Sequence, residues 1–262
     1  MIKSRVGHIN FLNVLPLTYS YKHGYSEGLE MTYDVPSALN EAIKNNRLDI
    51  SPISSIAYAR QSESLLLLPN ICIRADLDVT SIVLISKKPI EEITNDKIIF
   101  AEGYGATPEY QVNHVKLDNP IPDDATASLL IGDDALYIYL NTPKNLYCYD
   151  LGKEWHKVTG RSMVYAVWAV RRDFAKDSPE LLKLAYEKII SGMDNGIKNK
   201  GNAIKSVLEE KIFTYDELDR YLGNIIKWDL PKTSIESLME YYILAKKLKL
   251  IDEVPKIEFA SV

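Results

Sequence analysis

Two stretches indicate the fold most clearly: M-V-Y-A-V-W-A-V, residues 163–170, and T-S-I-V-L-I-S, residues 80–86. Each contains an unbroken run of apolar residues, which is typical of strands buried on both faces of a sheet. Two such strands, far apart in the sequence, predict a chain that crosses twice between two lobes. We expect an α/β protein with its second lobe inserted in the first, a two-strand hinge and a ligand cleft. The alternative is one continuous sheet with a long helical tail.

Strand and helix signals alternate around these two strands. Strands are predicted at residues 29–35, 48–53 and 65–74, with helices at 36–43 and 56–60, which implies a mainly parallel, helix-flanked sheet. The middle segment has strands at 98–101 and 128–131 and a helix at 133–139. After Arg172 the pattern is helical, with capping boxes at Thr214-x-x-Glu217 and Thr233-x-x-Glu236. The predicted domains are residues 1–82 plus 170–262, and residues 83–169.

Composition limits the class of protein. With 262 residues and 46% apolar side chains the chain can form sizeable cores, and its net charge of −5 argues against a nucleic-acid partner. Cys72 and Cys148 form no disulfide framework, and the first residues resemble no signal peptide. No apolar run is long enough for a membrane span. We expect a cytoplasmic protein that binds a small molecule, without nucleic acid or membrane as partner.

Common catalytic and cofactor motifs are absent from the sequence. The four histidines, His8, His23, His114 and His156, have no ligand partner at metal-binding spacing. The G-Y-G at residues 103–105 lacks the third glycine of a dinucleotide fingerprint, and there is no P-loop or G-x-S-x-G. We therefore expect no metal site and no nucleotide-binding motif.

The opening strand carries the first candidate site, V-G-H-I-N-F-L-N-V-L-P-L, residues 6–17. Two amides, Asn10 and Asn13, follow its apolar start, and Pro16 prevents the strand from continuing. In open α/β folds, side chains at the carboxyl end of a strand face small ligands. The alternative is a strand that ends in a hydrogen-bonded turn.

Hydroxyl and carboxylate side chains at other strand ends complete the candidate set. Ser51, Ser54 and Ser55 follow a strand and begin a helix, where they would bind a carboxylate or phosphate, or simply cap the helix. Ser81 begins a crossover strand, and the loop with Gly105 and Thr107 precedes another helix start. Asp133 either caps a helix or faces the cleft, and Arg74 pairs with an anion or lies on the surface. A cleft lined by neutral donors suits a solute-binding protein as well as an enzyme.

Five of these motifs, in this order, resemble the menaquinone biosynthetic enzyme family of the futalosine pathway. They are the opening stretch 6–17, R-L-D-I-S-P-I-S-S (47–55), L-L-I-G-D-D-A-L (129–136), Y-D-L-G-K-E-W-H-K-V-T-G (149–160) and V-Y-A-V-W-A (164–169). The sister enzyme that makes 1,4-dihydroxy-6-naphthoate opens with Ser-Pro-Cys-Pro-Asn, which this chain lacks. Fewer residues than usual separate F-A-E-G-Y-G-A-T-P-E-Y (100–110) from the third motif, so Thr107 would replace only part of the family's donors.

The resemblance implies a type II periplasmic-binding-protein fold used as an intracellular, cofactor-free carbon–oxygen lyase. The implied reaction removes water from chorismate and gives 3-[(1-carboxyvinyl)oxy]benzoate. By motif, Asn13 and Ser81 would contact the reacting substrate. The remaining substrate-binding residues implied or inferred are Asn10, Ser54, Ser55, Gly105, Thr107 and Asp133. The alternatives are a non-catalytic binding protein for small carboxylates with the same fold, and the sister naphthoate synthase.

Overall fold

The chain, described here from a computed structural model that covers residues 3–93 and 116–262, divides into two compact units. Unit 1 comprises Met1–Arg74 and Val164–Val262, and unit 2 comprises Ala75–Met163. The chain therefore leaves unit 1 at the end of one strand and returns to it at the start of another. The expected domain bounds, 1–82 with 170–262 and 83–169, stay a prediction. Gly105, Thr107, His114 and the expected strand at 98–101 lie outside the described residues.

Unit 1 is built on a five-stranded sheet in the order β2-β1-β3-β8-β4. Its strands are β1 (Ser4–Ile9), β2 (Leu29–Asp34), β3 (Ile50–Ser54), β4 (Leu65–Ala75) and β8 (Met163–Arg171). Strand β1 pairs in parallel with β2 and β3, whereas β8 runs antiparallel to β3, with Ile50 opposite Val170. The expected parallel pairing is confirmed for the first three strands. The late strand β8 enters the sheet between two early ones.

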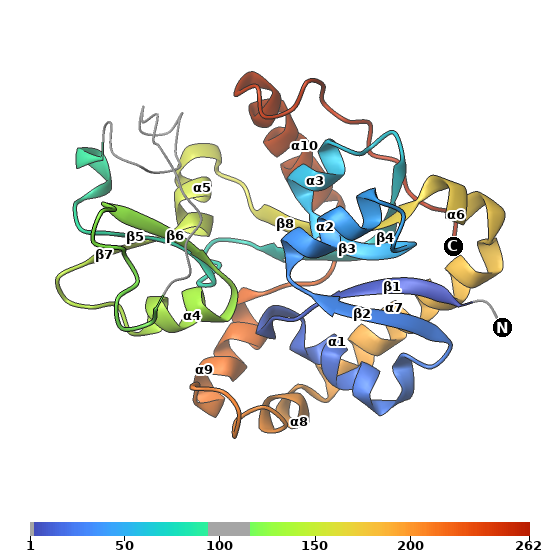
Figure 1. The fold of residues 1–262 in the computed structure, drawn as a ribbon, viewed down its shortest axis with the longest axis horizontal. Coiled ribbons are helices and arrows are strands. Elements are labelled where there is room, and N and C mark those ends of the chain that lie inside the picture. Colours follow the sequence, from blue (N-terminus) through green and yellow to red (C-terminus); the bar gives the residue numbers. More distant parts are fainter. Residues whose placement is uncertain (1–2, 94–115) are drawn as a thin grey trace. The chain divides into compact units, whose positions relative to one another are not determined.

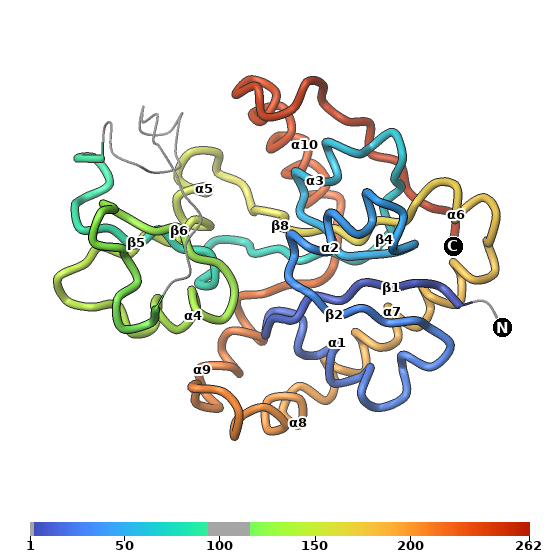
Figure 2. The backbone as a smooth tube through the Cα atoms, in the orientation of Figure 1, coloured from blue at the N-terminus to red at the C-terminus, as the bar shows by residue number. Residues whose placement is uncertain are grey.

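Helices cover both faces of this sheet. They are α1 (Leu15–Ser20), α2 (Pro36–Lys44), α3 (Ser55–Ala59), α6 (Arg172–Asp177), α7 (Pro179–Lys198), α8 (Lys200–Lys205), α9 (Tyr215–Arg220) and α10 (Lys232–Lys247), with short turns η1 (Leu12–Val14), η2 (Tyr21–Tyr25) and η4 (Tyr221–Ile225). Helix α7 packs on α1 and β1, while α3 packs on β3 and α10. Figure 1 shows α1 with α7 on one side of the strands and α3 with α10 on the other. Both chain ends belong to unit 1 (Figure 2).

Two helix starts test the expected capping boxes. At α9 the Thr214 hydroxyl accepts from the Glu217 N–H and the Glu217 carboxylate accepts from the Thr214 N–H, so this box is confirmed. The second box is wrong. Helix α10 begins at Lys232 after Pro231, and Thr233 lies inside its first turn, where its carbonyl accepts from Ser237 Oγ at 3.0 Å. The Pro231 carbonyl accepts from the N–H groups of Ser234 and Ile235, so the helix starts ahead of the threonine.

The contact between α1 and α7 depends on a glycine. A Cβ built on Gly196 in α7 would overlap the carbonyl oxygen of Pro16 in α1. The two backbones therefore touch at this point, and only a residue without a side chain fits there. This close packing fixes the segment that follows β1, which carries Asn13.

Unit 2 has a three-stranded sheet among its described residues, in the order β6-β5-β7 with antiparallel pairing throughout. Its elements are β5 (Ile82–Ser86), η3 (Ile90–Glu92), β6 (Ala127–Ile131), α4 (Gly132–Leu140), β7 (Tyr147–Asp150) and α5 (Leu151–Thr159). The expected strand 80–86 thus begins two positions later and is the central strand of this sheet.

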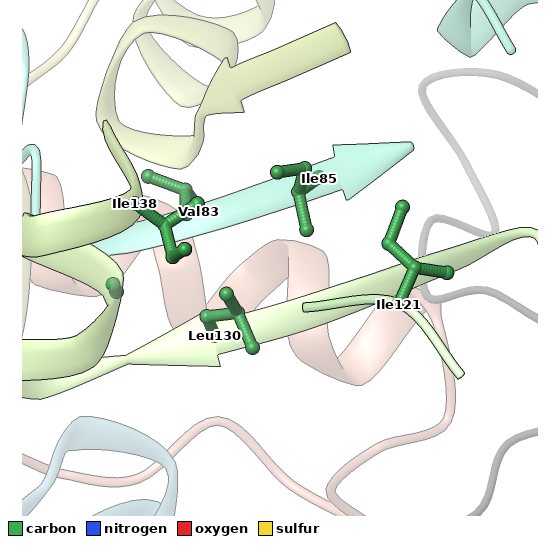
Figure 3. Packing of buried hydrophobic residues seen from close by; sticks show 6 residues of the cluster. Val83, Ile85, Ile121, Leu130 and Ile138 are labelled. Carbon is green, nitrogen blue, oxygen red and sulfur yellow. The ribbon is translucent and has the colours of Figure 1, made fainter. Parts of the chain in front are cut away.

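Side chains on the two faces of β5 contribute to two small hydrophobic cores. Val83 and Ile85 point to one face, where they pack with Ile121, Leu130 and Ile138 (Figure 3). Leu84 points to the other face and joins the cluster of Ile90, Ile93 and Ala127. Because successive residues of a strand face opposite ways, a continuous apolar run is needed to bury both sides. The expectation that residues 80–86 are buried on both faces is confirmed for this strand.

Candidate functional site

The loop after β1 holds the two candidate amides differently. Asn10 is exposed, and its N–H donates to the Asp34 carbonyl at 3.1 Å. The Asn13 carbonyl accepts from the indole N–H of Trp228 at 2.8 Å, whereas its side-chain Oδ1 is buried and has no hydrogen-bond partner among the described residues. A buried polar atom without a partner costs about 1–3 kcal/mol. The Asn13 oxygen therefore closes no turn among the described residues, and it can accept a hydrogen bond from a ligand.

Trp228 is a residue that the sequence analysis missed. It is 8% exposed and lies in the segment between η4 and α10. This segment is joined to β4, because the Cys72 N–H donates to the Trp228 carbonyl at 2.8 Å and Arg74 forms an ion pair with Asp229 at 2.9 Å. Arg74 thus pairs with the protein's own carboxylate. The C-terminal part of unit 1 holds the loop of Asn13 in place.

Beneath this loop lies a buried imidazole. His8 on β1 is 1% exposed, and its Nε2 lies 2.7 Å from Thr18 Oγ1. The Thr18 hydroxyl donates to the Val14 carbonyl, so Nε2 carries the proton and Nδ1 is left without a partner. Burial lowers the pKa of His8 to about 3. His8 is therefore a neutral core residue that supports the strand end.

The serines after β3 have separate structural tasks. Ser55 Oγ donates to the Val164 carbonyl at 2.6 Å and ties α3 to β8, and Ser51 Oγ donates to the carbonyl of Pro52. Ser54 caps α3, because its Oγ accepts from the Ala57 N–H at 3.3 Å. Its hydroxyl also accepts from the amide of Asn40, another residue that the sequence analysis missed. Ser54 alone of the three makes no donor bond within the described chain.

Unit 2 brings Ser81 and Asp133 together. Ser81 precedes β5 and is 4% exposed, its Oγ donates to the Val79 carbonyl at 3.3 Å, and its own carbonyl accepts from Gly132 N–H at 2.9 Å. Gly132 has a φ of +76°, which favours glycine, and Asp133 follows it in the first turn of α4. The two residues share one corner of unit 2.

A buried carboxylate organises that corner. Asp150, 3% exposed at the end of β7, accepts from the N–H groups of Val79 and Thr80 at 2.7–3.1 Å. It also accepts from the Gly152 and Lys153 N–H groups, at 2.8 and 3.2 Å, and so caps α5. Burial raises the pKa of the Asp150 carboxyl, and these N–H donors oppose that rise. Asp150 therefore couples the turn before Ser81 to the start of α5.

Within residues 3–93 and 116–262, no three His, Cys, Asp or Glu side chains gather as metal ligands. None of the described helices is long and apolar enough to cross a membrane.

The sequence model of a protein family described as menaquinone biosynthesis matches residues 4–247, nearly the whole chain. The chain belongs to this menaquinone biosynthesis family. A chorismate dehydratase of Thermus thermophilus is 27% identical over 195 aligned positions, and the match covers 64% of this chain and 70% of that protein. The matched range includes every candidate residue from Asn10 to Asp133.

Solved structures show the same fold. A protein of Archaeoglobus fulgidus has a TM-score of 0.72 at 18% identity over 95% of this chain and 98% of its own. A Candida albicans protein described as having the generic periplasmic-binding-protein fold has a TM-score of 0.64 at 12% identity, covering 100% and 98% of the two chains. The aliphatic sulphonate binding protein of Escherichia coli gives 0.62 at 9% identity, covering 97% and 90%. The family member thus has a periplasmic-binding-protein fold, as the sequence predicted.

Proposed function

We propose that this protein is a chorismate dehydratase, a hydro-lyase that converts chorismate to 3-[(1-carboxyvinyl)oxy]benzoate in menaquinone biosynthesis. The observation that carries the proposal is the family match across residues 4–247, together with the similarity to the Thermus thermophilus enzyme. The buried, unpartnered oxygen of Asn13 supports it, because such an atom is suited to a ligand that brings a hydrogen-bond donor.

The reaction needs positioning more than strong chemical groups. Loss of the C4 hydroxyl and the C3 hydrogen makes the ring aromatic, which drives the elimination. A protein that holds the dianion in a reactive conformer can lower the barrier by several kcal/mol. We assign Asn13 and Ser81 to the substrate's reacting region as neutral hydrogen-bonding groups. The Asn13 oxygen accepts from a substrate hydroxyl, and the amide and hydroxyl donors stabilise the departing hydroxyl or a carboxylate. Asn10, Ser54, Ser55, Gly105, Thr107 and Asp133 are the proposed binding residues around it.

The proton acceptor is either a carboxylate of chorismate or Asp133. Asp133 stands in the first turn of α4, directly after Gly132, whose N–H donates to the Ser81 carbonyl. Asp133→Asn removes a base while it keeps the shape of the side chain. A loss of kcat of about 10²-fold or more assigns the proton to Asp133, and an unchanged kcat assigns it to the substrate.

Purified protein is incubated with chorismate, and the product is followed by its aromatic absorbance and mass. Asn13→Ala and Ser81→Ala should each lower kcat/KM by roughly 10²-fold, the scale for loss of one preorganised hydrogen-bonding group. Their melting temperatures should change little if both side chains serve the substrate. Intact chorismate after incubation with and without added metal ions would contradict the dehydratase assignment. Unchanged kcat/KM in both variants would remove the two residues from the site.

The same preparations separate the alternatives. A non-catalytic binding protein gives heat of binding with chorismate in calorimetry but no product. The sister naphthoate synthase leaves chorismate unchanged and does not bind it.

A further inference from the structure

The side chain of Asn40 makes two hydrogen bonds to Ser54. Asn40 lies on α2 and is half-buried, as is Ser54. Asn40 Oδ1 accepts from the Ser54 N–H at 3.1 Å, and Asn40 Nδ2 donates to Ser54 Oγ at 3.2 Å. The two bonds fix which end of the amide is oxygen, because the backbone N–H can only donate.

These bonds determine where the hydroxyl hydrogen of Ser54 goes. A serine oxygen has two acceptor positions and one O–H donor. The acceptor positions of Ser54 Oγ receive Asn40 Nδ2 and the Ala57 N–H, at 3.2 and 3.3 Å. With both filled by donors, the hydrogen must point away from Asn40 and from α3. No carbonyl or carboxylate of the described residues accepts it, so an acceptor outside the protein can.

We propose that Asn40 is a positioning residue, which presents the Ser54 hydroxyl as a donor to a carboxylate of the substrate. The proposal rests on the proposed function for the identity of that substrate. An acidic residue in place of Asn40 would reverse the arrangement, since its oxygen would accept from Ser54 Oγ and turn the hydrogen inward. Asn40 acts only through Ser54 and does not itself contact substrate.

The test variant is Asn40→Asp, which keeps the size of the side chain and the acceptor for the Ser54 N–H. We expect KM for chorismate, and its Kd by calorimetry, to rise about tenfold or more, with a smaller change in kcat, because a hydrogen bond to a charged group is worth about 1.5–3 kcal/mol. The matched control is Asn45→Asp, which adds the same charge to the exposed end of α2 and should leave KM near the wild-type value.

A double-mutant cycle separates orientation of the hydroxyl from plain repulsion of the dianion. In a Ser54→Ala background, Asn40→Asp should have no further effect on KM beyond about twofold, because the hydroxyl it reorients is gone. A further tenfold rise in that background, or an equal rise in Asn45→Asp, would show that charge alone acts and would overturn the proposal. Melting temperatures of all variants exclude unfolding as the cause.

The proposed function and the positioning role of Asn40 fail in different experiments. If the wild type binds chorismate without converting it, the dehydratase assignment fails, and the Kd values of the cycle still decide the role of Asn40. If Asn40→Asp binds and converts chorismate as the wild type does, the dehydratase assignment stands and the positioning role is rejected. If the wild type does not bind chorismate, both are rejected.

Discussion

At the scale of single residues, the buried neutral His8 makes stability depend on pH. Its pKa is lowered by burial to about 3 in the folded protein, against an ordinary value of 6.5. Between pH 6.5 and about 3, His8 is protonated in the unfolded chain and neutral in the folded protein. His8 therefore stabilises the fold fully above pH 6.5, and this stabilisation is lost as the pH falls toward 3. At pH 5 the loss is about 2 kcal/mol.

Denaturant unfolding of the wild type and His8→Gln at pH 8 and pH 5 measures this directly. Glutamine keeps a donor for Thr18 but does not titrate, so we expect it to remove about 2 kcal/mol of the pH dependence. His23→Gln is the control, since His23 is exposed and should leave the dependence unchanged. A His8→Gln protein with the full wild-type pH dependence would contradict the burial argument.

A second residue, Gly196, tests the contact of α1 with α7. Gly196→Ala places a methyl group on the backbone of Pro16, which cannot move aside as a flexible side chain can. We expect the free energy of unfolding to fall by about 1–3 kcal/mol, measured by urea titration. In Gly201→Ala, also in a helix, the new Cβ meets only the far end of Tyr215, at 3.0 Å. That variant should be equal to the wild type or more stable, because alanine favours helix.

The sequence points to candidate site residues but not to the residues that hold them. Asn13 and Ser54 stand at strand ends, where local pattern marks them. Trp228 contacts Asn13 across 215 residues of sequence, and Asn40 meets Ser54 only because α2 lies against β3. Such partners depend on tertiary packing, and no local spacing indicates them. The bond of the Ser55 hydroxyl to the Val164 carbonyl on β8 is a further contact between distant parts of the sequence that no local pattern indicates.

At the scale of elements, Asp150 connects the turn before β5 with the start of α5. Asp150→Asn turns one acceptor oxygen into an NH₂ group that faces backbone N–H donors. We expect the free energy of unfolding to fall by about 1–3 kcal/mol, and kcat/KM per folded molecule to fall as well, because the turn that places Ser81 is loosened. Thermal unfolding and a chorismate assay on the same preparations provide both values.

Asp123→Asn is the matched control for this variant, because Asp123 is exposed and lies elsewhere in unit 2. Equal stability and activity of Asp150→Asn and Asp123→Asn would show that the hydrogen bonds of Asp150 to the backbone do not stabilise the fold.

Strands with a clear apolar pattern could be predicted from the sequence, while β7 could not. Strand β8 and the run at β5 are buried along most of their length, so hydrophobic pattern alone marks them. Strand β7 has only four residues and is mostly half-buried or exposed, which leaves no clear alternation. The antiparallel pairing of unit 2 also escaped prediction, since strand order is set by packing and not by the local pattern.

At the scale of the whole molecule, the last residues strengthen the sheet of unit 1. The Leu67 N–H donates to the Glu258 carbonyl and the Ala260 N–H donates to the Leu67 carbonyl, both at 2.8 Å, and the Tyr58 hydroxyl donates to the Lys256 carbonyl. Deletion of residues 256–262 should therefore lower the melting temperature by several degrees, because each lost bond contributes about 1 kcal/mol. Deletion of only the exposed residues 261–262 is the control and should change little. Equal melting temperatures for the two truncations would contradict this role.

The position of β8 between β3 and β4 has a consequence for synthesis on the ribosome. Strands β1 to β4 emerge first, but the place between β3 and β4 stays vacant until residue 171 has been translated. Unit 2, a continuous segment, is complete by then and can fold while the early strands wait. The nascent chain therefore carries two unpaired strand edges, which are prone to aggregation, during the translation of a whole inserted unit.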